Sequence, residues 1–285
     1  MTDPKTFTVA GATSDTGRVV QRLLEEAGHN VRPVARRHGV SLDDKAGLAR
    51  AFAGAWGAYL MMPFDLAAQN LHARERELCS SFAQAIRGSG LRRVVVLSGL
   101  SADLKRGSSL GAALLEDAIA PLGIPEVVFL RAGWFMENFA KGLDFAGQAA
   151  SGVFATPFRA DRPMPMVSAE DVGRRAAELL MSDEPGERIE ELLGARDYTM
   201  ADAAAVMSEA MGRAGVRYQQ VPLRDARAGM VSAGMSESFA DAVLETARSF
   251  NDNEPWGRQV RTARNTTAST LEQWSRQHLA PGVRP

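Results

Sequence analysis

The chain has 285 residues, of which 45% are hydrophobic and 24% charged, so it is long enough to bury a large core as an ordinary globular protein. Its 33 basic residues nearly balance 34 acidic ones, and its arginine pairs are dispersed, whereas a nucleic-acid-binding protein needs a concentrated basic surface. The single cysteine, Cys79, excludes an internal disulfide framework and a cysteine-rich metal site.

The first residues, MTDPKTFTVAG, lack the basic-then-apolar order of a signal peptide, and no apolar run approaches the roughly 20 residues that span a bilayer. We therefore expect a cytoplasmic protein with neither a membrane nor a nucleic-acid partner. Cys79 lies in a helical stretch, where burial as a small hydrophobic side chain is favoured over a nucleophilic role. The four histidines show no metal-ligand spacing, so no metal site is expected.

The first half of the chain alternates between short β-rich runs and helical patterns. Strands are predicted at Thr6–Ala10, Asn30–Ala35, 38–42 (HGVSL), Gly57–Met62, Arg93–Ser98 and Glu126–Arg131, and helices at Arg18–Ala27, Asp43–Ala53, Leu66–Ile86 and Ser109–Ala120. Pro33 inside the second strand argues for limited pairing there. Alternation at this spacing predicts βαβ units, hence a parallel sheet with helices on both faces.

The pattern loosens after about residue 134. Helices are expected at Asp171–Met181 and Met200–Arg213, strands at Arg188–Leu193 and 216–222 (VRYQQVP), and mostly helix beyond. The fold class is therefore α/β, a Rossmann-type doubly wound parallel sheet with a smaller, mostly helical C-terminal lobe. We assign residues 1–133 and parts of 165–195 to the dinucleotide-binding domain, and 134–164 and 195–285 to a lobe that covers the substrate. A ligand is expected between them, at the carboxyl ends of the strands.

The turn after the first strand, in TVAGATSDTGRVV, places Gly11, Ser14 and Gly17 in a G-x-x-x-x-x-G frame. Gly11 permits a tight exit from the strand, and Gly17 permits close packing of the following helix, whose first N–H groups face a pyrophosphate. Ser14 stands where a middle glycine is usual, and its hydroxyl is one donor available to a phosphate. A merely tight turn is the alternative, but the position before a full βα series favours a dinucleotide site formed by Gly11, Thr13, Ser14, Thr16 and Gly17.

Arginines stand where an NAD-preferring site usually has an acidic residue, about 20 residues after the glycine turn. The sequence there is VRPVARRHG, so Arg36 and Arg37 supply cations. A guanidinium suits a 2′-phosphate by its charge and its paired donors. We predict NADP(H) over NAD(H), with a solvated basic turn as the alternative.

The segments GATSDTG, LSGLS, LRAGWFMENF and MPMVSAEDVGRRAAELL together resemble the NmrA-like atypical short-chain dehydrogenase/reductase family over most of the chain. The chain looks closest to the branch that includes the ergot-alkaloid-type reductases. That resemblance implies a Rossmann fold, NADPH, a role in secondary metabolism, and reduction of an iminium or enal. Other members of the family are quinone reductases, phenylpropanoid reductases and cofactor-sensing regulators without turnover.

Two features depart from related enzymes. The stretch between the second and third strands is unusually short. The Tyr-x-x-x-Lys pair of conventional short-chain dehydrogenases is absent, because Ser108 and Ala112 occupy those positions and no tyrosine has a lysine four residues later. Alcohol dehydrogenation through the usual proton relay is therefore not expected.

Further site residues are expected at strand ends. Met61, Met62, Pro63, Ser98 and Gly133 are assigned to the cofactor, and Phe64, Trp134, Phe135, Asn138 and Met230 to the substrate, while Ser98, Ser101 and Asn138 are weak catalytic candidates. Each has a structural alternative: core packing for the aromatic residues and Met230, a helix cap for Glu137 and Asn138, and a turn hydrogen bond for Ser98. Glu116 and Asp117 are expected on a solvated helix face.

The leading hypothesis is an NADPH-dependent reductase of a small apolar electrophile such as an imine or iminium, a quinone or an enone. A protein that lacks the usual acid can reduce such electrophiles most easily. Hydride delivery to them needs only a correctly positioned cofactor and substrate and the exclusion of water. The alternatives are a non-catalytic NADP(H)-sensing regulator and a redox-neutral isomerase or cyclase. A small-molecule substrate is the expected partner, and a homodimer is left open.

Overall fold

The computed structural model describes residues 3–185, 188–213 and 215–280, so the last five residues of the predicted lobe lie outside the described residues. Contacts divide the chain into two compact units. The first unit comprises Met1–Lys105, Ser109–Arg131 and Val172–Glu190, and the second comprises Arg106–Ser108, Ala132–Asp171 and Glu191–Pro285.

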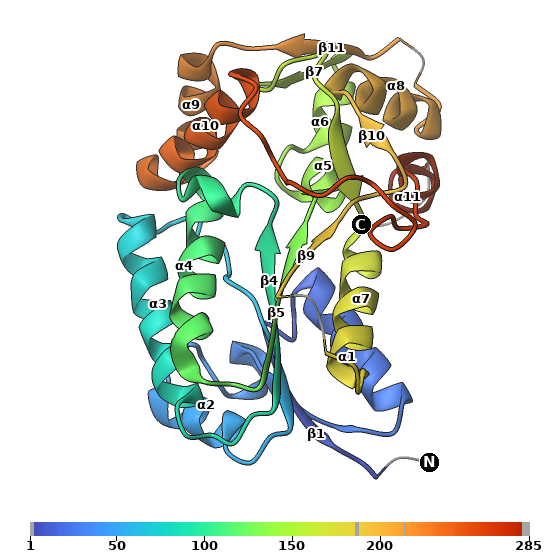
Figure 1. Ribbon diagram of the computed structural model, residues 1–285. Helices are drawn as coiled ribbons and strands as arrows, with labels where there is room; N and C mark the ends of the chain where they lie inside the picture. The colour runs from blue at the N-terminus through green and yellow to red at the C-terminus, as the bar shows by residue number, and fades with distance from the viewer. Residues whose placement is uncertain (1–2, 186–187, 214, 281–285) are drawn as a thin grey trace. The chain divides into compact units, whose positions relative to one another are not determined.

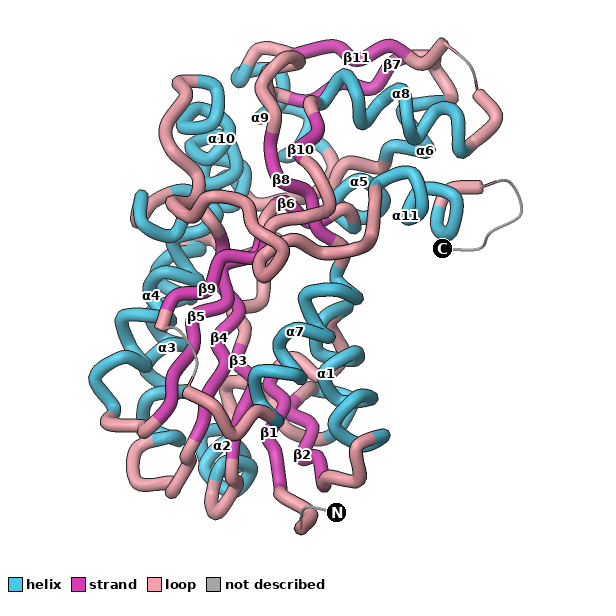
Figure 2. Tube along the Cα trace, turned by 45° about the vertical axis from the view of Figure 1, so that its right-hand side comes forward, coloured by secondary structure: helices cyan, strands magenta, loops and turns pink. Residues whose placement is uncertain are grey.

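A six-stranded sheet in the order β2-β1-β3-β4-β5-β9 forms the centre of the first unit, and the pairs β1–β2, β1–β3 and β3–β4 are parallel. Its strands are β1 (Thr6–Ala10), β2 (Asn30–Val34), β3 (Gly57–Leu60), β4 (Arg93–Gly99), β5 (Glu126–Ala132) and β9 (Ile189–Leu192). The helices are α1 (Asp15–Glu26), α2 (Lys45–Phe52), α3 (Leu71–Ile86), α4 (Leu110–Ile119) and α7 (Ala169–Met181). Helices α2, α3 and α4 cover one face and α1 and α7 the other (Figures 1 and 2), which confirms the predicted Rossmann-type class.

Strand composition and helix caps explain these elements. Val94, Val95 and Val96 in β4 are fully buried, as a strand covered by helices on both faces requires. The side chains of Asp44 and Asn70 each accept a backbone N–H at the start of α2 and α3, which satisfies donors left free by the first helical turn. Both helices therefore begin at a short polar residue.

The prediction of a brief strand at residues 38–42 was wrong. Arg36–His38 instead forms a 3-10 helix that ends at Gly39, whose φ of +79° is left-handed. The N–H of His38 donates to the carbonyl of Ala35 at 2.8 Å, so the chain folds back after β2 instead of adding a strand. β2 thus becomes the edge of the sheet, where Pro33 is tolerated because the edge needs fewer ladder donors.

The second unit combines two small sheets with short helices. Strands β10 (Asp197–Tyr198), β8 (Met164–Val167) and β6 (Trp134–Phe135) form one sheet, and β11 (Arg217–Gln220) pairs in parallel with β7 (Val153–Thr156). Its helices are α5 (Glu137–Lys141), α6 (Phe145–Ala149), α8 (Met200–Ala210), α9 (Leu223–Ser232), α10 (Glu237–Asn251) and α11 (Leu271–His278). Buried phenylalanines, among them Phe139, Phe154 and Phe158, form its core.

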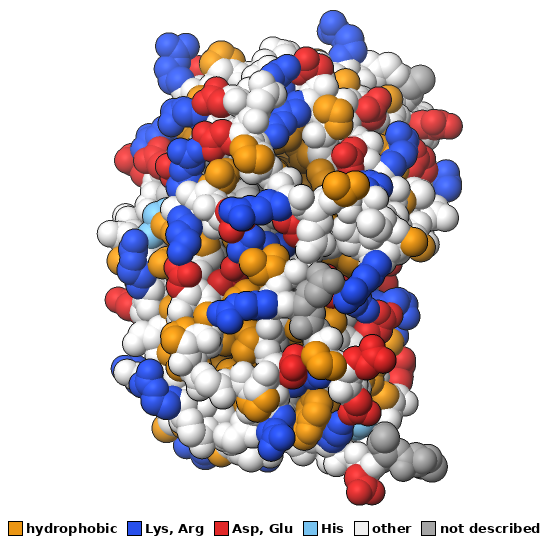
Figure 3. Space-filling view, viewed as in Figure 1, with side chains coloured by type: hydrophobic (Ala, Val, Ile, Leu, Met, Phe, Trp, Pro, Cys, Tyr) orange, Lys and Arg blue, Asp and Glu red, His pale blue; other side chains and the backbone are white. Residues whose placement is uncertain are grey.

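Three further 3-10 helices lie at Ala102–Leu104, Gly107–Ser109 and Ala120–Leu122. Within the described part of the chain, no helix has the length and apolarity needed to cross a membrane. On the face shown in Figure 3, basic and acidic side chains are interspersed, in keeping with their near-equal numbers.

Glu116 corrects the expectation of a solvated face on α4. Its carboxylate is buried and accepts two hydrogen bonds, at 2.9 and 2.7 Å, from the buried guanidinium of Arg131 at the end of β5. Arg131 also pairs with Asp103 at 2.9 Å, and the two carboxylates raise the pKa of Arg131, chiefly through the hydrogen bonds that Arg131 donates to Glu116. Asp117 on the same helix is exposed and pairs with Lys105, as expected. Cys79 is buried, which confirms its predicted role as a small hydrophobic side chain.

Glu75 is a second buried acid, located on α3 where it meets α4. It is 1% exposed, and its Oε2 lies 2.7 Å from Nδ1 of His72. Its Oε1 has no hydrogen-bond partner among the described residues and faces Gly111, where an added Cβ would lie 2.3 Å away. Burial raises the pKa of Glu75, and the hydrogen bond with His72 offsets only part of that shift.

We predict that Glu75→Gln increases stability more at high pH than at low pH. A carboxyl whose pKa is raised by folding contributes stability below its unfolded pKa and loses it as pH rises through the folded value. The amide keeps the shape and removes the buried charge, so its advantage over wild type should grow by at most about 1.4 kcal/mol per pH unit.

Chemical denaturation between about pH 5 and about pH 8 measures this difference. Glu77→Gln is the matched control, because Glu77 lies on the same helix with 70% of its side chain exposed. An advantage of Glu75→Gln that stays constant or shrinks as pH rises would contradict the assignment.

Candidate functional site

The glycine turn after β1 is as tight as its sequence predicts. Gly11 has a φ of +76°, and its N–H donates to the carbonyl of Val34 at 3.0 Å. A Cβ added to Gly17 would lie 2.1 Å from the carbonyl oxygen of Gly11, a distance that no side chain can occupy. The first turn of α1 therefore packs directly on the end of β1, and only glycine fits at position 17.

Polar side chains in this turn have partners that define their roles. Ser14 is the N-cap of α1, and its Oγ accepts the N–H of Gly17 at 3.0 Å, which leaves its hydroxyl proton to donate. Asp15 pairs with Arg18 at 2.7 Å on the solvent side of the helix. The hydroxyl of Thr16 lies 2.7 Å from the hydroxyl of buried Tyr59, so a contact between Thr16 and a ligand would use its main chain.

The N–H groups of Thr13 and Thr16 have no acceptor among the described residues. They lie at the positive end of the dipole of α1, a helix of 12 residues. Unpartnered N–H groups at a helix N-terminus bind phosphate oxygens well. The turn therefore has the donors that a pyrophosphate needs.

Arg36 and Arg37 follow β2 in the 3-10 helix, and both side chains are exposed. Among the described residues, neither guanidinium has a hydrogen-bond or ion-pair partner. Two adjacent cations without carboxylates give this point of the first unit an uncompensated positive charge. Such a charge suits a phosphate monoester.

The segment after β3 contacts the glycine turn through Met61. A Cβ on Gly11 would lie 2.6 Å from the sulfur of Met61, so this side chain covers the turn. Met62 and Pro63 are half-buried, and Phe64 is 61% exposed. β3 ends at Leu60, two residues earlier than predicted, which leaves Met61 and Met62 in the loop.

Ser98 lies near the end of β4 with its side chain buried and 4% of the residue exposed. Its Oγ has no hydrogen-bond partner in the described structure, so the expected alternative of a turn hydrogen bond is not found. A buried hydroxyl without a partner is costly unless a ligand supplies one. Ser101, by contrast, shares a hydrogen bond of 2.7 Å with the hydroxyl of Ser109.

The second unit contains the residues that follow β5. A Cβ on Gly133 would lie 2.7 Å from the carbonyl oxygen of Pro165, so close packing on β8 already requires this glycine. Trp134 and Phe135 pair with β8, and the indole of Trp134 contacts Phe158 edge-on at 4.9 Å. The indole N–H of Trp134 is buried without a partner in the described structure, as Ser98 Oγ is.

The expected cap of the following helix by Glu137 and Asn138 is wrong: both residues lie inside α5, whose start has no side-chain cap, and only Glu137 caps a helix, α7. The carboxylate of Glu137 accepts the N–H of Ala169, the first residue of α7, and the indole N–H of Trp274. Asn138 lies inside α5 and caps nothing; its half-buried amide has no hydrogen bond within the described part of the chain. Met230, on α9, is half-buried.

Each of the three tyrosines uses its hydroxyl within the protein. Tyr59 bonds with Thr16, Tyr198 donates to Glu272 at 2.7 Å, and Tyr218 donates to the carbonyl of Phe158 at 2.5 Å. Burial raises the pKa of all three, that of Tyr218 to about 12. The contact between Tyr59 and Thr16 spans 43 residues, so no local pattern could reveal it. Within the described residues no group of three or more His, Cys, Asp or Glu side chains is arranged to hold a metal ion.

Several known proteins resemble this chain in sequence or in fold. An NAD(P)H azoreductase of Xenophilus azovorans is 24% identical over 249 residues, which are 83% of this chain and 84% of that protein. The triphenylmethane reductase of Citrobacter sp. has a similar structure, with a TM-score of 0.74 and 18% identity over 96% of this chain and 99% of that one.

Two similar structures contain a nucleotide. The NADPH-dependent quinone oxidoreductase QOR2 of Escherichia coli, complexed with NADPH, has a TM-score of 0.71 and 20% identity over 94% of this chain and 98% of that one. NmrA, a negative transcriptional regulator solved with NADP, has a TM-score of 0.66 and 18% identity over 100% of this chain and 93% of that one. NmrA has also been solved with NAD, with the same TM-score and identity to this chain.

The resemblance to a family extends over nearly the whole chain. A sequence profile of the NmrA-like family matches residues 3–276. The narrower resemblance to ergot-alkaloid-type reductases is not tested by these similarities and stays a prediction. The chain belongs to the NmrA-like family.

Proposed function

We propose that this protein is an NADPH-dependent reductase that transfers hydride to a small, largely apolar conjugated electrophile without a tyrosine–lysine proton relay. The observation that carries the proposal is a set of donors at the carboxyl ends of β1, β2 and β4 that have no partner among the described residues. They are the N–H groups of Thr13 and Thr16, the guanidinium groups of Arg36 and Arg37, and the hydroxyl of Ser98.

These donors fit a reduced nicotinamide dinucleotide phosphate. The glycine turn would hold the pyrophosphate, Arg36 and Arg37 the 2′-phosphate, and Ser98 a ribose hydroxyl or the carboxamide of the nicotinamide. Gly11 and Gly17 allow the backbone to come close to the phosphates. When bound, such a cofactor supplies the hydride, and the protein supplies position and exclusion of water.

The expected class of electrophile is one that needs no strong proton donor, because the tyrosines of this protein are poorly suited to that role. The three tyrosines are bonded internally and have raised pKa values, so each is a poor proton donor near neutral pH. A quinone, an iminium, an enone or an extended dye accepts hydride without a strong acid beside it. The names of the similar azoreductase, triphenylmethane reductase and quinone oxidoreductase support this range.

Trp134 and Asn138 are the proposed substrate contacts of the second unit. The indole N–H of Trp134 and the amide of Asn138 are donors without partners in the described residues, and the ring of Trp134 contacts the buried ring of Phe158. A planar electrophile with one polar atom would satisfy such a donor and pack on the ring.

A second candidate is a regulator that senses NADP(H) and turns nothing over. The structural similarity to NmrA supports it, and the same cofactor donors serve both functions. The two candidates differ only in whether bound NADPH is consumed.

Gly17→Ala should abolish tight NADPH binding, because its Cβ would force α1 away from the carbonyl of Gly11. Thermal shift with and without saturating NADPH measures the loss. The control is Gly229→Ala on α9, where an added Cβ meets no atom within 4 Å and helix propensity should raise stability by up to about 1 kcal/mol. Gly17→Ala with wild-type NADPH affinity would overturn the assigned role of the turn.

Removing the arginines that follow β2 should abolish the preference for NADPH over NADH. Arg36→Ala and Arg37→Ala should each weaken NADPH by about tenfold or more and leave NADH nearly unchanged, because a charged hydrogen bond is worth about 1.5–3 kcal/mol. Calorimetric titration of both cofactors onto wild type and variants measures this. Arg18→Ala, on the exposed side of α1, is the control and should change neither affinity. Equal affinities of the wild-type protein for NADPH and NADH would refute the assignment.

NADPH consumption should be detectable with at least one of a panel of quinones, cyclic imines, enones and azo or triphenylmethane dyes. Trp134→Phe keeps an aromatic ring and loses the N–H, so kcat/KM should fall by up to about tenfold. Trp56→Phe in the first unit should change little. Stable NADPH binding with no consumption by any compound would favour the sensing candidate.

A further inference from the structure

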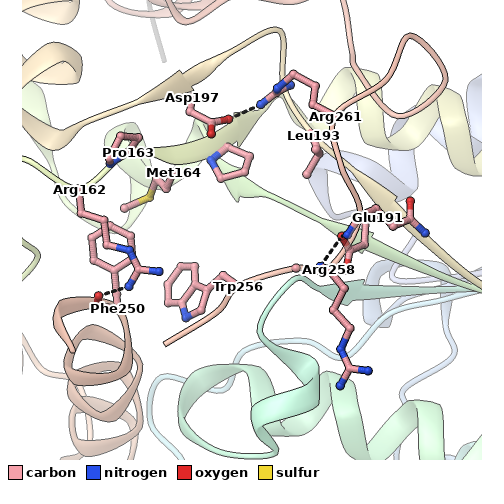
Figure 4. Close-up of a pocket in the computed structure, with 13 residues that line it drawn as sticks. Arg162, Pro163, Met164, Glu191, Leu193, Asp197, Phe250, Trp256, Arg258 and Arg261 are labelled. Carbon is pink, nitrogen blue, oxygen red and sulfur yellow. Dashed lines mark hydrogen bonds and ion pairs between the residues drawn. The ribbon is translucent and has the colours of Figure 1, made fainter. Parts of the chain in front are cut away.

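A separate pocket lies wholly within the second unit and includes none of the residues assigned above to cofactor or substrate. It has a volume of about 300 Å³ and is formed by the segment leading into β8, the end of α10 and the chain from Trp256 to Arg261. Figure 4 shows Arg162 beside Phe250 and Trp256, with Pro163 and Met164 above them. A cavity of this size is at the small end of known ligand pockets and suits a compact ligand.

One part of the pocket is aromatic and apolar. The rings of Phe250 and Trp256 have centroids 5.2 Å apart at 55°. Pro163 and Pro165 supply further accessible apolar surface, while Met164 and Phe250 are each only 1% exposed. Such surface favours a flat ring, which gains contact area and quadrupole complementarity against an indole.

Arg162 supplies a positive charge to this aromatic part. Its guanidinium lies 4.4 Å from the ring centroid of Phe250 and donates to the backbone carbonyls of Phe250 and Glu254. A guanidinium has five N–H donors, so these two bonds leave three. No carboxylate pairs with Arg162 within the described residues, and burial together with the charge of Arg159 lowers the pKa of Arg162.

The two acidic residues of the pocket have partners of their own. Glu191 accepts the backbone N–H groups of Arg258 and Gln259 at 2.8–2.9 Å. Asp197 pairs with Arg261, which also donates to the carbonyl of Gly194. The side chain of Arg258 points away from the group of rings (Figure 4). Arg162 is therefore the cation of the pocket whose described partners are all neutral.

We propose that this pocket binds a small aromatic carboxylate, with the carboxylate on Arg162 and the ring against Trp256. The carboxylate supplies the charge that the carbonyl partners of Arg162 lack, and it fits the planar donor geometry of a guanidinium. A neutral aromatic compound lacks that charge, and an inorganic anion lacks the ring. Binding here does not depend on NADPH or on turnover.

Benzoate is the probe, and calorimetric titration of the full chain measures its affinity. We expect saturable binding with a Kd of about 1 mM or tighter. Benzamide has the same shape without charge and should bind at least about tenfold more weakly. Cyclohexanecarboxylate keeps the charge without the flat ring and should also bind more weakly. Absence of benzoate binding at about 20 mM, or equal affinity for benzamide, would overturn the proposal.

Three variants locate the binding. Arg162→Gln should weaken benzoate by about tenfold or more. Arg159→Gln is the matched control, because it removes the same charge from a neighbouring arginine that pairs with Asp161 outside the pocket. If both variants weaken benzoate equally, the effect is general electrostatics and the proposal fails.

Arg162 donates to two backbone carbonyls, so circular dichroism is used to check that Arg162→Gln is folded. Trp256→Ala then gives an independent result: it should abolish the preference for benzoate over cyclohexanecarboxylate while leaving charge selectivity against benzamide. A preference unchanged in Trp256→Ala would place the ring elsewhere and overturn the proposal.

Discussion

The first unit depends on one close approach, that of α1 to the end of β1. Position 17 meets the carbonyl of Gly11 so closely that a single Cβ would separate the two elements. Because the helix starts there, Ser14 can cap it, and the N–H groups of Thr13 and Thr16 find no acceptor in the part of the chain that the structure describes. The same approach places Met61 over the turn. The packing of the helix therefore also leaves backbone donors of the kind that bind phosphate.

The hydrogen-bond and ion-pair partners of four arginines distinguish side chains that complete the fold from side chains that are available to the proposed cofactor. Arg131 is buried between Glu116 and Asp103, and Arg32 donates to carbonyls at the end of α2; both complete the fold. Removing one member of a buried ion pair typically destabilises a protein by about 3–5 kcal/mol. The role of Arg131 is therefore to stabilise the fold. Arg36 and Arg37 instead have no partner in the described structure, which leaves their charges for a ligand.

Local patterns predicted most of the fold. Patterns within a few residues predict three kinds of feature: the buried valines of β4, the helix caps at Asp44 and Asn70, and the glycines at positions 11 and 17. Most of the failures involve distant contacts, and one involves a local turn. The sequence of Glu116 and Asp117 is typical of a solvated helix face, and only the position of Arg131 on β5 explains why Glu116 is buried. The missing strand at residues 38–42 depends on a turn that starts at the carbonyl of Ala35, which outweighs a weak β propensity. The unpartnered states of Ser98 and Trp134 likewise appear only once all neighbours are placed.

The most direct test of the central claim, that the first unit recognises the phosphorylated adenosine half of NADP(H), uses that half alone. Calorimetric titration with 2′,5′-ADP and with 5′-AMP compares molecules that differ by the 2′-phosphate and omits the nicotinamide and any substrate. We predict clear preference for 2′,5′-ADP, falling steeply with salt because exposed arginines contact it. Equal affinity for the two molecules, or binding of neither, would contradict the account.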